Sequence, residues 1–393
     1  MFDFNQVIER RGTHAMKWDR IKALSGIDAD DALPMWVADM DFRAPPGVTE
    51  ALREEIERGT HGYYADTGSW AEALVDWMQR RHDVRFDPAW VSPTPGVVSG
   101  LGLILQAVSE PGDDVILFPP VYHAFRRIIP ANDRNILDAP LFESDGRYHM
   151  DLDALAAKIT PKAKAVFFCT PHNPGGTVWT ADEIRGLADL CERHDLILVS
   201  DEIHCDLLFD GSRHVPTIKA APAIADRLIT TVAATKTFNL AGAHVGACVT
   251  SNSELKKRLD KRISASGLGS YNGFGMIATE AAWRTGDAWL DALLPYLAAN
   301  RDFFEQGIGT AVPGARAMHL ASTYLTWIDF KGTGLSPDEV ADRVKKAARI
   351  FASPGEQFGP GGDTWLRFNI ATPRPILEDA LNRLNDAFGD LRS

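Results

Sequence analysis

The stretch Leu196-Ile-Leu-Val-Ser-Asp-Glu-Ile-His204 sets the pattern of the chain: a short apolar run is followed at once by a carboxylate and an imidazole. Before it, the capping box Thr180-Ala-Asp-Glu183 predicts a helix that runs to about His194 and has its apolar positions on one face. Apolar runs that alternate with helices in this way are typical of a parallel sheet covered on both sides. We therefore expect an α/β fold with such a sheet at its centre.

Four further apolar runs extend this predicted sheet, namely Val115–Phe118, Ala165–Cys169, Leu228–Ala233 and Val245–Thr250. The C-terminal part differs, because the predicted strands Tyr324–Phe330 and Trp365–Ile370 flank a helix that begins at the capping box Ser336-Pro-Asp-Glu339. We expect an N-terminal segment (1–45) that packs with a small domain, a large domain (46–290) with a mostly parallel sheet, and a small α+β domain (291–393).

The composition limits the class of protein. The chain has 393 residues, of which 45% are hydrophobic and 24% charged, as in globular proteins with a sizeable core. Its net charge of −12 argues against binding to nucleic acid, which requires a basic surface.

Four cysteines without a Cys-x-x-Cys pair, and an N-terminus without an apolar stretch, predict a reducing compartment and no secretory signal. No apolar run approaches the roughly 20 residues that cross a bilayer. We therefore expect a cytoplasmic protein that binds neither nucleic acid nor membrane.

Chemically capable side chains follow four of the predicted strands: Tyr122, Asn173, Asp201 with His204, and Lys236. Each has an ordinary explanation by itself. Asp201 could cap a helix, and Asn173-Pro-Gly-Gly is a turn sequence. Ligands of open parallel sheets, however, gather outside the carboxyl ends of the strands. The co-occurrence of these residues in this order predicts one shared site there.

These residues and the motifs around them resemble the fold-type I family of pyridoxal-phosphate enzymes, which includes the class I/II aminotransferases. The resemblance is closest to the C–S lyase branch, the cystathionine β-lyases of the MalY/PatB type, and it covers nearly the whole chain. The matching motifs are Arg11-Gly-Thr, Lys17-Trp-Asp, the stretch from Leu33 to Phe42, Gly62-Tyr63, Pro95-Gly-Val-Val98, His172-Asn-Pro174, the stretch from Ser200 to His204, the stretch from Lys236 to Gly242, and the stretch from Arg367 to Arg374.

The resemblance implies a fold-type I architecture, a pyridoxal 5'-phosphate cofactor and a role for each motif. Lys236 would condense with the cofactor aldehyde and move the substrate proton, because burial lowers the pKa of an amine and makes it reactive. Asp201 would favour protonation of the cofactor ring nitrogen. The resemblance places Tyr122 on the cofactor ring, and Asn173 and His204 near the phenolic oxygen.

The remaining roles concern the phosphate and the substrate. Val97 and Val98 precede a helix expected at Ser99–Val108, so their N–H groups would bind the phosphate together with the hydroxyl of Thr235. The resemblance also implies that Tyr63 reaches the phosphate of a partner subunit, and hence a homodimer with shared active sites. Arg367 would bind the substrate carboxylate as a planar, bidentate donor. No metal is expected.

The implied reaction is α,β-elimination from L-cystathionine or a related L-cysteine S-conjugate, which releases a thiol, pyruvate and ammonia. The alternative is a class I/II aminotransferase of an L-amino acid. His244 favours the lyase, since typical aminotransferases have a phosphate-binding arginine at this position, eight residues after the lysine. His123 and Ser322 depart from the usual sequence of the lyase branch and leave the preferred conjugate open.

Two other classes are less consistent with the sequence. A non-catalytic binding protein on the same fold is disfavoured because Lys236 and Asp201 are both present. A nicotinamide dehydrogenase is disfavoured because no Gly-x-Gly-x-x-Gly motif follows a predicted strand.

Overall fold

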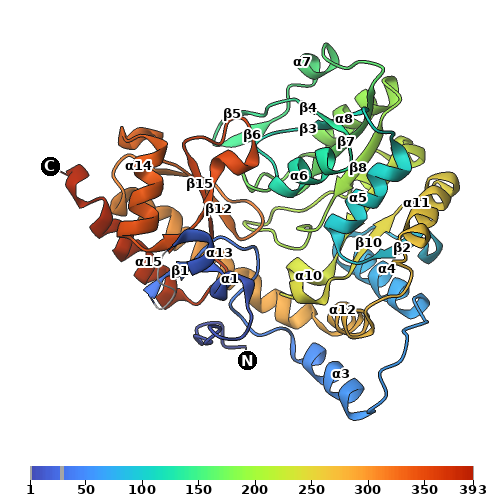
Figure 1. Ribbon diagram of the computed structural model, residues 1–393, viewed down its shortest axis with the longest axis horizontal. Coiled ribbons are helices and arrows are strands. Elements are labelled where there is room, and N and C mark those ends of the chain that lie inside the picture. The colour runs from blue at the N-terminus through green and yellow to red at the C-terminus, as the bar shows by residue number, and fades with distance from the viewer. Residues whose placement is uncertain (1, 27–30, 393) are drawn as a thin grey trace.

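The computed structural model describes residues 2–26 and 31–392, and a seven-stranded sheet lies at its centre (Figure 1). In spatial order the strands are β2 (Val91–Thr94), β10 (Gly246–Val249), β9 (Leu228–Val232), β8 (Ile197–Asp201), β7 (Ala163–Cys169), β3 (Asp114–Leu117) and β4 (Asn135–Asp138). All neighbouring pairs from β9 to β4 are parallel, which confirms the mostly parallel sheet.

The predicted strand at 245–250 forms, as β10, but it runs antiparallel to both of its neighbours. The connection from β9 contains the single-turn helix α10 (Ala234–Thr237) and the short turn η4 (Ala241–Ala243), and no long helix that would return the chain across the sheet. As a consequence β10 starts at the same edge of the sheet at which β9 ends.

Helices cover both faces of this sheet, as the alternation of its side chains requires. On one face α5 (Val97–Val108), α6 (His123–Ala131) and α11 (Ser253–Ala265) pack against Val115, Phe167 and Ile229. On the other, α7 (Leu152–Ala156), α8 (Ala181–Arg193) and α9 (Thr217–Ala220) pack against Val166 and Leu198. The predicted capping box is present at the start of α8, where Glu183 N donates to Thr180 Oγ1 (3.2 Å) and Thr180 N to Glu183 Oε2 (2.8 Å).

A further group of helices lies beside β2, β10 and the C-terminal part: α3 (Pro46–Glu57), α4 (Gly68–His82), α12 (Gly273–Thr285) and α13 (Asp287–Ala311). The expected domain boundary at 290/291 falls inside α13, which continues without a break into the C-terminal part. The division into domains therefore stays a prediction. Among the helices of the described chain, none is long and apolar enough to cross a bilayer.

The C-terminal part is built on an antiparallel sheet of β11 (Arg316–Met318), β12 (Leu325–Asp329), β15 (Trp365–Asn369) and β14 (Ser353–Pro354), with α14 (Pro337–Asp342) and α15 (Arg374–Ala387). The hairpin β5 (Phe142–Ser144) and β6 (Arg147–His149) follows β4. From the N-terminal segment, which contains α1 (Met16–Asp19) and α2 (Ile21–Ser25), β1 (Leu33–Pro34) pairs with β13 (Ile350–Phe351). This brings residues 35–42 alongside β15, between the two sheets.

Candidate active site

Asp201 is the last residue of β8, and its carboxylate lies within the fold at the carboxyl edge of the large sheet. It accepts hydrogen bonds from Thr231 Oγ1 (3.0 Å) on β9 and from Ile203 N (3.4 Å). Burial raises its pKa to about 6, and the bond from Thr231 opposes this shift. At neutral pH the side chain is therefore a desolvated carboxylate, which stabilises a positive charge placed beside it.

Lys236 lies on α10, directly after the neighbouring strand β9. Its Nζ donates a hydrogen bond to the carbonyl oxygen of Ala38 (2.5 Å). Burial lowers the pKa of the amine to about 8; Arg367 acts in the same direction, and Asp39 and Asp201 oppose the shift. A substantial fraction of this amine is therefore unprotonated, and nucleophilic, near neutral pH.

The carbonyl that receives Lys236 belongs to a segment that buried ion pairs hold in place. Asp41 accepts from Lys17 Nζ (2.6 Å), Arg10 Nη1 (2.7 Å) and Trp18 Nε1 (2.9 Å). The side chain of Asn239, three residues after Lys236, accepts a hydrogen bond from Met40 N at Oδ1 (2.8 Å) and donates one from Nδ2 to Met40 O (3.0 Å). The N-terminal segment thus forms one wall of the site. The identities of the residues in this segment do not indicate this contribution, because it is made by a backbone carbonyl, which every residue has.

Arg367 faces the same space from β15 and is 2% exposed. Its Nη1 donates to Asn173 Oδ1 (2.9 Å) and its Nη2 to Trp36 O (2.9 Å), whereas none of the described residues accepts a hydrogen bond from the buried Nε. Burial lowers its pKa to about 10, so the guanidinium stays charged at neutral pH. Because β15 lies between β12 and β14, Arg367 is not on a solvated edge strand. Its neutral partners leave the positive charge available to an anion.

Aromatic and imidazole rings line the space between these groups. The ring of Tyr122, the N-cap residue of α6, contacts that of His123 at 5.0 Å between centroids. The ring of His204 packs edge-on against Tyr324 at 6.3 Å, and Tyr324 donates to Ala38 O (3.0 Å), the same oxygen that Lys236 contacts.

Both imidazoles are neutral. Burial, together with the charges of Lys236 and Arg367, lowers the pKa of His204 to about 3. Burial and the arginines Arg367 and Arg127 lower the pKa of His123 to about 4. Within residues 2–26 and 31–392, no group forms a hydrogen bond with the buried Nδ1 atoms of His123 and His204, so each ring has a free polar position in the site.

The expected anion-binding turn begins α5. This helix starts at Val97 rather than at Ser99, so Val97 and Val98 belong to its first turn and have N–H groups without partners in the helix. Gly96 precedes it at φ +86°, and a Cβ on Gly246 would lie 2.9 Å from Val97 N, so both positions require glycine. Val97 shares an apolar cluster with Ala233, which precedes α10 and the buried Thr235. Gly246, which lies against Val97, begins β10, and β10 pairs with β9, so the turn and the start of α10 lie at the same edge of the sheet.

Tyr63 is the expected site residue that the single chain does not bring to these groups: its side chain is 95% exposed. His244 follows η4 in the left-handed conformation (φ +50°) and is also exposed. Ser322 is buried and donates to Gly176 O (2.9 Å).

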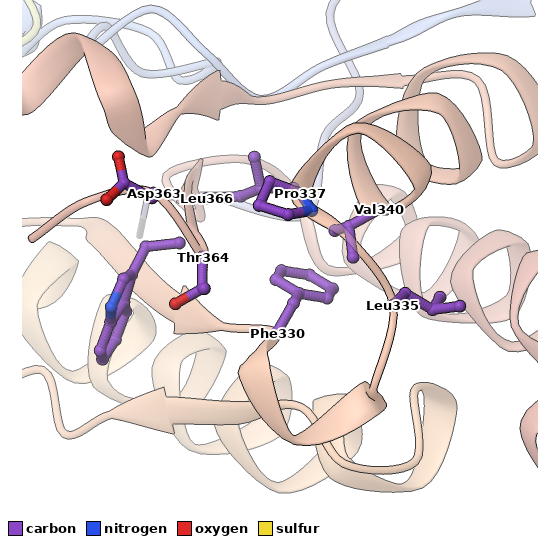
Figure 2. Close-up of a pocket in the computed structure, with 8 residues that line it drawn as sticks. Phe330, Leu335, Pro337, Val340, Asp363, Thr364 and Leu366 are labelled. Atoms are coloured by element: carbon purple, nitrogen blue, oxygen red, sulfur yellow. The ribbon is translucent and has the colours of Figure 1, made fainter.

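A small cavity in the C-terminal part lies apart from this site (Figure 2). It is bordered by Phe330, Leu335, Pro337, Val340 and residues 363–366, and its volume of about 20 Å³ accommodates little more than one water molecule. It is therefore too small for a substrate.

The chain is similar to known proteins over nearly its whole length. The sequence profile of the family described as aminotransferase class I and II matches residues 33–384. Cystathionine β-lyase PatB of Bacillus subtilis is 38% identical over 98% of this chain and 99% of its own length. The crystal structure of cystalysin from Treponema denticola, which contains pyridoxal 5'-phosphate, superposes with a TM-score of 0.96 at 32% identity over 100% of both chains. The pyridoxal-phosphate-bound C–S lyase of Staphylococcus hominis superposes with a TM-score of 0.91 at 30% identity, over 99% of this chain and 98% of its own.

Proposed function

The chain belongs to the aminotransferase class I and II family, and from this premise we propose that it is a pyridoxal-phosphate-dependent C–S β-lyase. Its substrate is L-cystathionine or a related L-cysteine S-conjugate, which it cleaves, with uptake of one water molecule, to a thiol, pyruvate and ammonia. One observation supports this most strongly: a lysine with a lowered pKa, a buried carboxylate and a buried arginine that pairs with no carboxylate of the described chain meet at one sheet edge. The full-length similarity to a cystathionine β-lyase and to C–S lyases adds to it.

The residues present fit pyridoxal 5'-phosphate. Lys236 is the amine for its aldehyde, and Asp201 is the ionised partner for its ring nitrogen. Tyr122 supplies a ring to stack on it, and Asn173 and the free Nδ1 of His204 are the polar groups for its phenolic oxygen. The first turn of α5, at Val97 and Val98, and the hydroxyl of Thr235 are the donors for its phosphate.

When bound, the cofactor supplies an electron sink for the charge that develops on the substrate Cα. The protein side chains do the rest. Arg367 binds the substrate carboxylate and thereby orients the Cα–H bond toward Lys236. Lys236 then removes the Cα proton as a general base, for which a pKa near 8 is well matched to neutral pH. Asp201 holds the proton on the ring nitrogen, and the neutral His123 and His204 leave this charge distribution undisturbed.

The second candidate is an aminotransferase of an L-amino acid, because the family also contains transaminases. His244 favours the lyase: it stands eight residues after Lys236, where typical aminotransferases place a phosphate-binding arginine. An imidazole is a weaker and pH-dependent partner for a phosphate than a guanidinium.

Pyruvate release tests this proposal. The purified holoenzyme is given L-cystathionine without any keto acid, and pyruvate and ammonia are measured. We expect catalytic and equimolar amounts of both, and none from the Lys236→Ala variant. Turnover only after addition of 2-oxoglutarate and an amino donor would instead identify an aminotransferase.

We also propose that the enzyme is a homodimer in which Tyr63 of each chain reaches the phosphate of the other. The side chain of Tyr63 is exposed, and two residues before it the ring of His61 contacts the partly exposed ring of Phe274, at 5.3 Å between centroids. These three rings together offer an aromatic contact surface to a second subunit. Sedimentation velocity of wild type and Tyr63→Phe should give dimers in both, with weaker cofactor retention in the variant. The location in the cytoplasm stays a prediction.

A further inference from the structure

A second buried carboxylate, Asp206, lies behind the site in the turn that follows β8. Its side chain is 3% exposed, and three donors from two other parts of the fold converge on it. They are His82 Nε2 (2.7 Å to Oδ1), Trp77 Nε1 (3.1 Å to Oδ1 and 3.2 Å to Oδ2) and Thr237 Oγ1 (2.6 Å to Oδ2). Burial raises the pKa of Asp206, but the hydrogen bonds and the nearby His82 outweigh this and lower it overall. The group is therefore a carboxylate at neutral pH.

One of these donors connects Asp206 to the reactive lysine. Thr237 directly follows Lys236 and is the last residue of α10, a helix of a single turn that cannot hold its own geometry through internal hydrogen bonds. The next residue, Phe238, packs its ring against Trp77 (5.2 Å between centroids), so the same tryptophan contacts both Asp206 and the end of α10. The backbone that carries Lys236 is thus fixed from behind by α4 and Asp206.

The outer side of this network faces solvent. His82, at the C-terminal end of α4, and Asp206 line a surface cleft of about 640 Å³ that is also bordered by Arg81 and Arg213. The His82–Asp206 pair is therefore the layer between this cleft and α10. No part of the proposed reaction uses Asp206, His82 or Thr237 directly.

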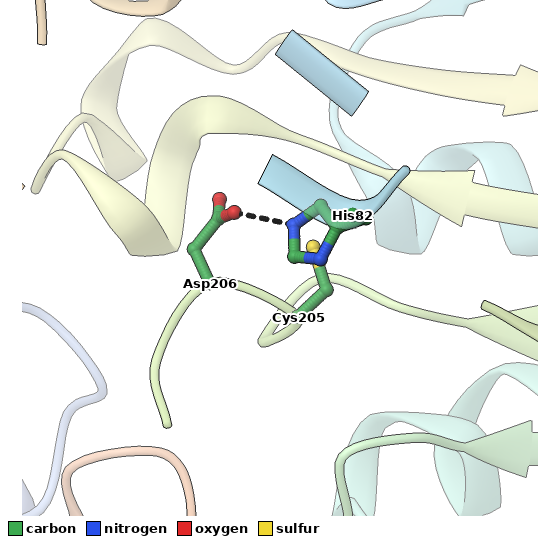
Figure 3. Close-up of side chains that lie close together, drawn as sticks. All are labelled: His82, Cys205 and Asp206. Atoms are coloured by element: carbon green, nitrogen blue, oxygen red, sulfur yellow. Dashed lines mark hydrogen bonds and ion pairs between the residues drawn. The ribbon is translucent and has the colours of Figure 1, made fainter. Parts of the chain in front are cut away.

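His82, Cys205 and Asp206 also form a cluster whose ligand atoms lie within 4.8 Å of one another (Figure 3). The hydrogen bonds argue against a metal centre there. His82 Nε2 points at Asp206, and both carboxylate oxygens already accept from other donors. Burial moreover raises the pKa of the Cys205 thiol well above its usual value, which disfavours the thiolate that would bind a metal.

We propose that Asp206, oriented by His82 and Trp77, is a positioning residue for Lys236. Its hydrogen bond with Thr237 Oγ1 fixes α10 so that Lys236 Nζ stays at the Ala38 carbonyl, among Asp39, Asp201 and Arg367. This role rests on the proposed function of Lys236 as the cofactor-binding lysine and general base. The sequence contains no local signal for it, since His82 is 124 positions before Asp206.

Three threonine variants test the proposal. Thr237→Val keeps the shape and removes the hydroxyl, whereas Thr237→Ser keeps the hydroxyl. Thr279→Val is the matched control: Thr279 on α12 is equally buried and accepts a hydrogen bond from Trp70 (2.8 Å), another tryptophan of α4, but it is remote in sequence from Lys236. Each holoenzyme is measured for kcat and KM with L-cystathionine, for thermal stability, and for the pH midpoint of the visible absorbance of the bound cofactor.

We expect Thr237→Val to lower kcat by about tenfold or more with KM changed less than about threefold, because positioning acts on the transition state. Its absorbance midpoint should move to higher pH as water reaches the nitrogen that links Lys236 to the cofactor and favours its protonated form, and Thr237→Ser should restore kcat to within about twofold of wild type and the midpoint to the wild-type pH. Thr279→Val should lose thermal stability without either change. A Thr237→Val enzyme that loses only stability, and keeps kcat per active site and the midpoint, would show that Asp206 is merely structural.

Two further measurements keep the outcome unambiguous. If Thr237→Val does not fold, His82→Gln, which can still donate to Asp206, is compared with His82→Leu, which cannot; equal midpoints in these two would contradict the proposal.

If wild type releases no pyruvate but shows the cofactor band, and Lys236→Ala lacks it, the proposed reaction is wrong while the midpoint still tests the positioning. If Lys236→Ala keeps the band, the proposed role of Lys236 itself is wrong.

Discussion

Replacing Arg367 by glutamine removes a charge that the fold leaves uncompensated. Among the described residues its hydrogen-bond partners are the neutral oxygens of Asn173, Trp36 and Ser353, and no carboxylate forms an ion pair with it. A buried charge without an acidic partner is costly to the folded protein. In the proposed enzyme this cost is offset when the substrate carboxylate arrives, and the free Nε is a donor available for it.

The expected loss follows from this geometry. Removing one partner of a buried, hydrogen-bonded charge pair costs about 2–5 kcal/mol in binding. At 1.4 kcal/mol per factor of ten, kcat/KM for L-cystathionine should fall about 30- to 4,000-fold in Arg367→Gln. Thermal stability should change little, because the variant loses hydrogen bonds but also loses a desolvated charge.

A coupled assay of pyruvate formation measures this change. Arg316→Gln is the control, since Arg316 lies in the same C-terminal sheet but its side chain is 50% exposed and paired with Glu143; its kcat/KM should stay within about twofold of wild type because surface ion pairs contribute little. Wild type should also prefer the L-cysteine conjugate strongly over the matching amine without a carboxylate, and Arg367→Gln should lose this preference. A kcat/KM within threefold of wild type, or an unchanged preference, would refute the role of Arg367.

Three further predictions concern the proton chemistry and the N-terminal wall. Because the pKa of Lys236 is lowered from 10.5 to about 8, the rate at which apoenzyme takes up cofactor should rise between about pH 7 and 9 and then level off, whereas a rise that continues to pH 10.5 would contradict the shift. Asp201→Asn should lower kcat by at least about a hundredfold while the cofactor still binds, since the ring nitrogen loses its ionic partner; stopped-flow measurement of Cα-proton removal from deuterated substrate checks this. Asp41→Asn removes the nearer of the two carboxylates that pair with the fully buried Lys17, at 2.6 Å, and leaves Asp39 at 3.7 Å; it should lower the free energy of unfolding by about 3 kcal/mol in urea titrations. The pKa of Asp41 is lowered by Lys17 despite burial, so its contribution is present above its usual pKa of 3.8 and should be lost as the pH falls through the lower value of the folded state.

Residues that follow directly from a strand could be placed from the sequence. Asp201 ends β8 and Lys236 comes a few residues after β9. Because neighbouring parallel strands end at the same edge of a sheet, the positions of the two residues relative to their strands suffice to bring them together. Arg367 required more, because only the position of β15 inside its sheet shows that this side chain is buried. The assigned roles of these residues stay predictions.

Contacts made by backbone atoms, or by residues far apart in the chain, could not be predicted from local patterns. The carbonyls of Trp36 and Ala38 receive Arg367 and Lys236 from a segment without helix or strand periodicity. The antiparallel direction of β10 depends on how its connection packs rather than on its apolar pattern. The contact between His82 and Asp206 depends on where α4 docks, which is a property of the assembled core.

The central claim is that Lys236 is the residue that binds the cofactor. Reduction of the holoenzyme with sodium borohydride makes the link between the cofactor and its lysine permanent, and digestion followed by mass spectrometry then identifies the modified peptide. We predict one modified site, at Lys236, and loss of that modification when L-cystathionine is present during reduction. Modification at any other lysine, or none at all, would contradict the account.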